Sequence, residues 1–283
     1  MSSHDDILSM GSLLVSRTYL YMLFHKIFGG EPTEELVQTL TSELTVDVID
    51  EYADNSNTMR GGMLFLKEFA EHDRASVIDQ AKDEYTRLFI GPDHLPASPW
   101  ESPYVTKDPA IFQENTLVVR ETFRAHGFLP KSYMRVPDDH ISLLMHFLGG
   151  RAHTSVETFF SQDAAVLIAQ LGDQLAFVQH HLNNWLSHYA IDARASKTAV
   201  LYPQMIEAAA EFCKLDEIFL GEALLWLEDN RSDTGILEVA PEAGVVFNRV
   251  IQACDKLASL RLPGLDENEL ERIDTKDIIV NEG

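Results

Sequence analysis

Apolar residues recur along most of the chain with the three- to four-residue spacing of an α-helix rather than the alternation of a β-strand. In residues 12–28, one helical stripe holds Leu13, Leu20, Phe24 and Ile27. Gly29-Gly30 follows directly, and a glycine pair in this position predicts the end of a helix. The same period predicts helices over residues 59–71, 75–90, 110–126, 155–172, 174–190, 203–228 and 245–262.

Two further helix starts carry proline and acidic residues in the first turn. Pro32-Thr33-Glu34-Glu35 predicts one of them, and Pro137-Asp138-Asp139 predicts the other. The helix after Asp139 has apolar residues at the spacing i, i+3, i+4, i+7, namely Ile141, Leu144, Met145 and Leu148. Gly149-Gly150 predicts that this helix is short and ends there.

These patterns predict the fold class and a division of the chain. Alternating strands with hairpin turns and internal repeats are absent from the sequence. We therefore predict an all-α protein with a single helical-bundle domain of about ten helices over residues 1–228 and a C-terminal helical appendage over 229–283. In the appendage, Asp229–Gly244 is expected to be an acidic linker and 245–262 an extra helix. The tail from Pro263, with seven acidic and two basic residues, is expected to be mobile.

Charge and cysteine content narrow the classes of partner. The 283 residues include 22 basic and 45 acidic ones, for a formal net charge of -23. This charge disfavours nucleic acid and anionic membranes and favours a basic partner such as an arginine-containing peptide, although acid also serves solubility alone. Cys213 and Cys254 have no metal-binding spacing and are expected to be inert thiols. Without a secretory signal or a bilayer-spanning apolar run, we expect a cytoplasmic protein with no stable membrane insertion.

Motifs for nucleophilic or metal catalysis are missing from the sequence. It contains no G-x-S-x-G, no H-E-x-x-H and no glycine-rich phosphate loop. His180, Asn184 and His188 share a helix face, but this spacing favours solvated or core-edge histidines over metal ligands. We expect no metal and no cofactor.

Asp138-Asp139-His140 admits two interpretations. Acidic residues at a helix N-terminus stabilise the helix dipole, and one aspartate would suffice for that. The second acid and the imidazole could instead point into a pocket and bind a cation. The residues themselves leave both interpretations open.

A proline-rich loop, EYTRLFIGPDHLPASPWESPY over residues 84–104, separates two predicted helices. Its rigid and aromatic residues are Pro92, Pro96, Pro99, Pro103, Phe89, Trp100 and Tyr104. Such a loop could be a connector whose aromatic side chains plug the core. It could equally be a recognition surface, because proline lowers the entropy cost of binding and tryptophan and tyrosine are favoured anchors.

Several blocks of the sequence resemble the TorD/DmsD/NarJ-type redox-enzyme maturation chaperones. LFIGPDHLPASPWESPY (88–104) is similar to the family signature Leu-Phe-x-Gly-Pro, Leu-Pro, Pro-Trp-x-Ser and an aromatic residue. VPDDHISLLMHFLGG (136–150) resembles its Pro-x-Asp-His helix start, and SRTYLYMLFHKIFGGEPTEEL (16–36) resembles its first helix. AAAEFCKLDEIFLGE (208–222) resembles its closing helix, so the likeness covers about 16–228.

The resemblance implies an all-helical cytoplasmic chaperone that is not an enzyme. Members bind the twin-arginine leader of a molybdopterin oxidoreductase catalytic subunit, or the subunit itself, and hold it for cofactor insertion while delaying export. Carried over to this chain, together with Glu101 and Asp138 beside the matching positions, the client-binding residues would be Leu88, Pro99, Trp100, Glu101, Ser102, Tyr104, Asp138, Asp139 and His140. Asp139, with Glu101, would bind a guanidinium group, and Trp100, Tyr104 and Leu88 would bind apolar leader residues.

The chain also departs from the family pattern. Glu101 stands where glycine is common, Pro103 stands where valine is common, and some fifty residues follow the closing helix. Two other functions stay open: a helical hydrolase or nucleotide-binding protein using Asp138, Asp139 and His140, for which guanine nucleotide has been suggested in the family, and a scaffold that dimerises through its C-terminal helix. The sequence leaves open whether the chain is a monomer or a homodimer.

Overall fold

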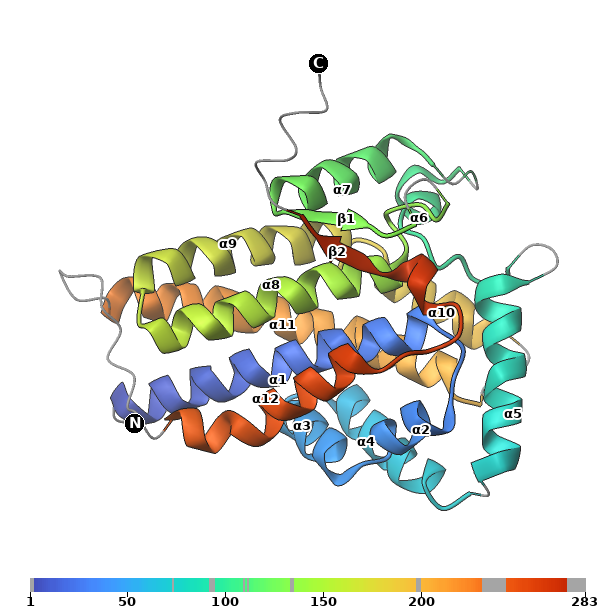
Figure 1. Ribbon diagram of the computed structural model, residues 1–283, viewed down its shortest axis with the longest axis horizontal. Helices are drawn as coiled ribbons and strands as arrows, with labels where there is room; N and C mark the ends of the chain where they lie inside the picture. Colours follow the sequence, from blue (N-terminus) through green and yellow to red (C-terminus); the bar gives the residue numbers. More distant parts are fainter. Residues whose placement is uncertain are drawn as a thin grey trace.

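The computed structural model describes residues 3–72, 74–91, 95–108, 110, 112–132, 135–196, 200–230 and 243–273. Within these residues the chain is built almost entirely of α-helices, which confirms the predicted all-α class (Figure 1). The helices are α1 (Ser3–Gly29), α2 (Glu34–Leu40), α3 (Glu43–Ala53), α4 (Asn57–Phe69), α5 (Arg74–Tyr85), α6 (Ser102–Thr106), α7 (Glu114–Ala125), α8 (Ile141–Ser161), α9 (Ala164–His181), α10 (Leu186–Ala195), α11 (Tyr202–Asn230) and α12 (Ala243–Ser259). Two helical turns, η1 (Thr86–Ile90) and η2 (Leu265–Asn268), and two short strands, β1 (Phe128–Pro130) and β2 (Leu270–Arg272), complete the described fold.

Short polar side chains begin several of these helices. The hydroxyls of Thr33, Ser42 and Ser56 accept hydrogen bonds from backbone N–H groups in the first turns of α2, α3 and α4. The apolar pattern does not predict helix α3, because its sequence ELTVDVIDEYA shows only a few apolar positions between acidic ones. Its buried face, which includes Val48 and Ile49, nevertheless packs into the core.

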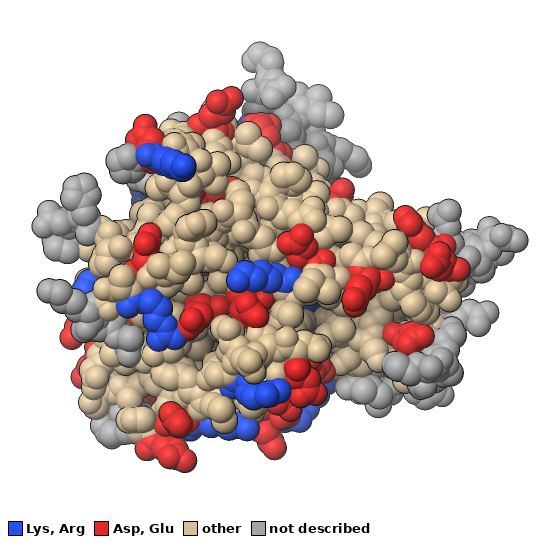
Figure 2. Space-filling view, turned by 180° about the vertical axis from the view of Figure 1, so that it is seen from behind, with Lys and Arg blue, Asp and Glu red and all other residues tan. Residues whose placement is uncertain are grey.

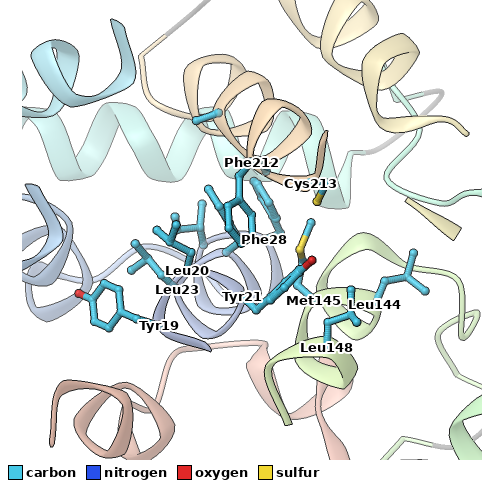
Figure 3. Close-up of a cluster of buried hydrophobic side chains, with 14 of the residues drawn as sticks. Tyr19, Leu20, Tyr21, Leu23, Phe28, Leu144, Met145, Leu148, Phe212 and Cys213 are labelled. Carbon is cyan, nitrogen blue, oxygen red and sulfur yellow. The ribbon is translucent and has the colours of Figure 1, made fainter. Parts of the chain in front are cut away.

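Helix α1 lies at the centre of the bundle, with α8, α11 and α12 around it (Figure 1). In Figure 3, Tyr21 and Phe28 of α1 face Phe212 and Cys213 of α11, and Leu144, Met145 and Leu148 of α8 lie beside them. By length and composition the window Asp6–Gly29 would also suit a membrane span, but 72% of it is buried inside the bundle, as in a core helix. The two cysteines, Cys213 and Cys254, are free and buried, as predicted.

A buried polar network joins four helices in the middle of this core. Arg17 of α1 donates two parallel hydrogen bonds to Asp216 of α11, of 2.7 and 2.8 Å, and neither side chain has exposed surface. Arg17 also donates to Gln174 of α9 at 2.6 Å, and Gln174 donates to Ser155 of α8 at 2.8 Å. The hydroxyl of Tyr21 donates to Asp216 at 2.6 Å. The carboxylate thus has several partners, which a buried charge requires.

The predicted end of a helix at Gly149-Gly150 is wrong, because α8 continues to Ser161. Both glycines are sites of close packing. A Cβ atom on Gly149 would lie 2.7 Å from the sulfur of Met22 on α1, and one on Gly150 would lie 2.9 Å from the ring of Phe128. The glycines therefore allow α1 and β1 to approach α8 and do not mark a helix end.

The prediction of a mobile tail from Pro263 is wrong for residues 263–273. We refer to residues 260–273 as the C-terminal segment; it follows α12, which packs along α1 (Figure 1). Within it, Leu265 and Leu270 are buried, and β2 pairs with β1 in antiparallel register with Leu270 opposite Pro130. The predicted linker lies mostly outside the described residues, at 231–242, as do 274–283.

An ion-pair cluster holds the C-terminal segment to the bundle. The carboxylate of Glu269 lies 3.4 Å from the ammonium of Lys26 on α1 and 3.5 Å from the guanidinium of Arg261, and it also binds Lys131. The side chain of Lys26 is 1% exposed and that of Glu269 is 4% exposed. Charge buried on α1 is thus neutralised by a residue that follows the family-like part of the chain.

Candidate functional site

The proline-rich loop is fixed to the start of α8 by backbone hydrogen bonds. Glu101 donates its N–H to the carbonyl of Asp139 at 3.1 Å, and Ile141 donates to the carbonyl of Pro99 at 2.9 Å. Trp100 and His140 are therefore paired across a β-bridge, with ring centroids 5.5 Å apart in an edge-on arrangement. The structure thus brings together the two blocks of sequence from which the site was predicted. Pro92, in the same loop, lies outside the described residues.

Asp139 is enclosed by this contact and has no exposed surface. Its Oδ2 accepts hydrogen bonds from the backbone N–H of Ser102 at 2.8 Å and the Ser102 hydroxyl at 2.5 Å, and Oδ1 accepts from the Thr116 hydroxyl at 3.2 Å. Burial raises the pKa of Asp139, and the hydrogen bonds from Ser102 oppose that rise. The carboxylate therefore ties the loop to α7 and α8 and is not open to a guanidinium group, contrary to expectation.

The other two predicted carboxylates are also buried and paired. Asp138 accepts from the guanidinium of Arg120 on α7 at 2.6 Å. Glu101, whose side chain is 1% exposed, lies 3.1 Å from Nδ1 of His181 and accepts from Asn184 at 2.9 Å. Asn184, which the sequence analysis weighed together with His180 and His188 as a metal site, thus binds the loop. The described residues contain no group of three or more His, Cys, Asp or Glu placed to hold a metal ion.

Leu88 belongs to the core and the partly buried Tyr104 packs against it, as in the alternative interpretation of the loop. Tyr104 packs against Trp185 and Tyr189, with ring centroids 5.4 and 6.2 Å away, and its hydroxyl accepts from the N–H of Ser98 at 3.2 Å. Leu88, in η1, is 1% exposed. These two side chains position the loop, and neither lines the pocket beside Trp100 and His140.

A pocket of ≈ 400 Å³ remains beside Trp100 and His140. One side is aromatic and apolar, and the opposite side belongs to the C-terminal segment. The lining residues are Glu31, Tyr85, Phe89, Ile90, Trp100, Val136, His140, Pro263, Gly264, Glu267 and Asn268. Of the predicted site residues, the pocket therefore contains Trp100 and His140, while the carboxylates at its edge are Glu31 and Glu267.

Two hydrogen-bond donors at this pocket have no partner in the described part of the chain. Nδ1 of His140 accepts from the N–H of Ser142 at 3.2 Å, as the cap of α8, so the ring hydrogen resides on Nε2. Burial lowers the pKa of His140 to about 3, which keeps the ring neutral at physiological pH. The indole N–H of Trp100 is buried and unpaired as well. A ligand that supplies a hydrogen-bond acceptor would satisfy the Nε2–H of His140.

The hydrogen bonds of Asp139 predict a structural role that can be measured. We expect Asp139→Asn to lower the free energy of unfolding by about 1–2 kcal/mol, because the amide accepts more weakly from the two buried donors of Ser102. Urea unfolding tests this, with Asp50→Asn, at an exposed position of α3, as a control that should change stability by less than about 0.5 kcal/mol. Unchanged stability together with a loss of peptide affinity would instead make Asp139 a ligand-binding residue.

Comparison with known proteins shows which proteins this chain resembles. A family profile described as "Nitrate reductase delta subunit" matches residues 53–190, which include the proline-rich loop and the start of α8. The protein described as "Chaperone protein TorD" of Vibrio vulnificus (strain CMCP6) is 25% identical over 205 residues, which is 72% of this chain and 94% of that protein. The chain therefore resembles the TorD/DmsD/NarJ-like maturation chaperones. Two further relatives of this TorD/DmsD/NarJ-like chain are DmsD proteins. The "Probable Tat proofreading chaperone DmsD" of Haemophilus influenzae is 25% identical over 38% of this chain and 45% of its own length. The "Tat proofreading chaperone DmsD" of Salmonella typhi is 34% identical over 22% and 30%.

The sequence did not predict about half of the residues that line the pocket of this TorD/DmsD/NarJ-like protein. Glu31 falls between two predicted helices and Tyr85 within the predicted helix 75–90, and neither pattern marks a site; Pro263 to Asn268 fall in the predicted mobile tail. The apolar residues Leu262, Leu265 and Leu270, spaced through the acidic tail, are the one signal that this segment packs. The profile match also ends well before this segment, so family likeness gives no indication of it.

Proposed function

We propose that this protein is a cytoplasmic, client-specific chaperone for a molybdopterin oxidoreductase catalytic subunit. It binds the twin-arginine leader of that subunit, its apo form, or both, holds the subunit for cofactor insertion and delays its export. The family profile match and the chaperone relatives support this role. The observation that supports leader binding is the pocket formed by the loop, η1 and the C-terminal segment.

The chemistry of the pocket fits an extended, basic and partly apolar peptide. Trp100 and Phe89 offer aromatic surface to an apolar side chain. The Nε2–H of His140 offers a hydrogen bond to a peptide carbonyl. The net charge of -23 favours the approach of a basic segment with a salt-sensitive association rate. On the face drawn in Figure 2, the described acidic side chains are spread among basic and uncharged ones, so this long-range attraction would add to the pocket and not replace it.

Leader binding is expected to depend on Trp100. Trp100→Ala should weaken a synthetic twin-arginine leader peptide by about 1–3 kcal/mol, the usual effect of losing an aromatic anchor. Isothermal titration calorimetry measures this, and Trp226→Ala on α11 is the matched control, since Trp226 is only partly buried and does not line the pocket. Equal affinity of the Trp100 variant and the wild-type protein, with intact folding, would place the leader elsewhere.

A hydrolase or nucleotide-binding role for Asp138, Asp139 and His140 has less support. Asp138 is paired with Arg120 and Asp139 with Ser102, so neither carboxylate is available as a base beside the imidazole. Affinity capture from the native host separates the two functions. Co-purification of a molybdoenzyme subunit in its apo form supports the chaperone, whereas turnover of guanine nucleotide lost on His140→Ala would support the enzyme.

A further inference from the structure

Two glutamate carboxylates line the pocket, and they come from separate parts of the chain. Glu31 lies in the connection between α1 and α2, and Glu267 lies in η2 of the C-terminal segment. Both are close to Tyr85, whose pKa is raised first by burial and then by the negative charges of Glu31 and Glu267. The backbone holds the two together, because the N–H of Glu31 donates to the carbonyl of Pro263 at 2.8 Å.

These two carboxylates differ from the three that the sequence singled out. Glu267 is exposed, and its carboxylate has no hydrogen-bond or ion-pair partner among the described residues. Glu31 has one partner, the ammonium of Lys82 at 3.2 Å, with side chains 36% and 42% exposed respectively. Exposed pairs of this kind are weak and exchange readily for a better partner. The negative charge available to a ligand in this pocket therefore lies on Glu31 and Glu267.

The unpaired donor of His140 supplies an independent indication of the ligand. His140 is 4% exposed, lines the pocket and has no described partner for its Nε2–H. A free cation has no acceptor to offer this group, whereas a peptide offers backbone carbonyls along with its side chains. The His140 donor and the carboxylates of Glu31 and Glu267 together fit an extended peptide that carries a guanidinium group.

We propose that the C-terminal segment forms part of the leader-binding site and that Glu31 and Glu267 bind an arginine side chain of the leader. This inference rests on the proposed function. It identifies the residues that bind the positively charged side chain of the leader. The C-terminal segment then acts as a specificity element that the family-like part of the chain lacks.

The test is titration calorimetry of a synthetic twin-arginine leader peptide with the full chain. Glu31→Gln and Glu267→Gln should each raise the Kd about fivefold, because a charge-assisted contact becomes a neutral one. Glu271→Gln removes an equal charge from the same segment but does not line the pocket, and it should change the Kd by less than about twofold. With glutamines in place of the peptide arginines, all three variants should bind like the wild-type protein, since the same contact is already lost.

Lys82→Gln gives a result in the opposite direction. This change frees Glu31 from its competing partner, so the Kd for the arginine peptide should fall about two- to threefold. If Glu31→Gln and Glu267→Gln bind like Glu271→Gln while the wild-type protein binds the peptide, the assignment of the arginine is overturned and the proposed function stands. If the wild-type protein binds neither leader peptide nor apo-subunit, the proposed function itself fails.

Discussion

Asp216→Ala is expected to lower the free energy of unfolding by about 3–5 kcal/mol, because it leaves the guanidinium of Arg17 buried without its counter-ion. Burial by itself would lower the pKa of Arg17, but the adjacent Asp216 outweighs burial and raises it, so the arginine stays charged in the core. The hydroxyl of Tyr21 loses its acceptor in the same variant. Guanidinium chloride unfolding followed by circular dichroism measures the loss.

A double variant distinguishes two causes of the stability loss, a buried charge without its counter-ion and an empty cavity. Arg17→Met combined with Asp216→Leu removes both charges and keeps apolar volume, so it should be more stable than Asp216→Ala alone. Asp229→Ala, an exposed position near the end of α11, should lie within about 0.5 kcal/mol of the wild-type protein. A loss of less than about 1 kcal/mol in Asp216→Ala would show that the ion pair contributes little to the bundle.

Helical periodicity predicted the class and most long elements because these helices bury one apolar stripe each. Residues 203–228 and 245–262 correspond closely to α11 and α12. The start of α8 at Ile141 agrees with the prediction, but the later boundaries up to residue 195 were wrong, since α8 ends at Ser161 and α9 and α10 begin and end elsewhere. Glycine lowers helix propensity only modestly, and at Gly149 the close approach of Met22 favours continuing the helix. That contact joins α1 to α8 and is invisible in the local sequence.

The candidate site was predicted only in part for a similar reason. Motif spacing correctly brought Trp100 and His140 together, because the loop and the α8 start pair through their backbones. The partners of the acidic residues come from elsewhere: Arg120 is 18 residues from Asp138, and His181 is 80 residues from Glu101. Whether a carboxylate is accessible to a ligand depends on such contacts. The sequence alone therefore could not distinguish the accessible carboxylates of Glu31 and Glu267 from the buried carboxylate of Asp139.

The docking of the C-terminal segment predicts a second large loss of stability. Glu269→Ala should lower the free energy of unfolding by about 3 kcal/mol, because Lys26 would remain buried without its carboxylate. Burial already lowers the pKa of Lys26, and Glu269 partly offsets that effect. Lys26→Met combined with Glu269→Ala should recover much of the loss. Glu271→Ala, an exposed neighbour in β2, should have little effect in the same unfolding experiment.

The pH dependence of this loss has a definite sign. Burial alone would raise the pKa of Glu269, but the hydrogen bond from Lys131 and the charge of Lys26 outweigh it and lower the pKa below its usual range. A carboxylate whose pKa falls on folding stabilises the protein above its unfolded pKa of about 4.3, and this stabilisation is lost as the pH falls through the folded value. The stability difference between wild-type protein and Glu269→Ala should therefore be full at pH 7 and shrink below about pH 4. A constant difference across this range would mean that the carboxylate charge does not hold the segment.

Leader binding by the same variant connects this ion pair to the pocket. Glu269 does not line the pocket, so its replacement can reduce affinity only by releasing the segment that carries Glu267. We expect Glu269→Ala to weaken the twin-arginine peptide at neutral pH and Lys26→Met/Glu269→Ala to restore binding together with stability. Glu267→Gln should show the reverse pattern, a weaker peptide with unchanged unfolding, because its exposed side chain contributes little to packing. Loss of stability in Glu269→Ala without any loss of affinity would show that the segment supports the fold without forming a wall of the site.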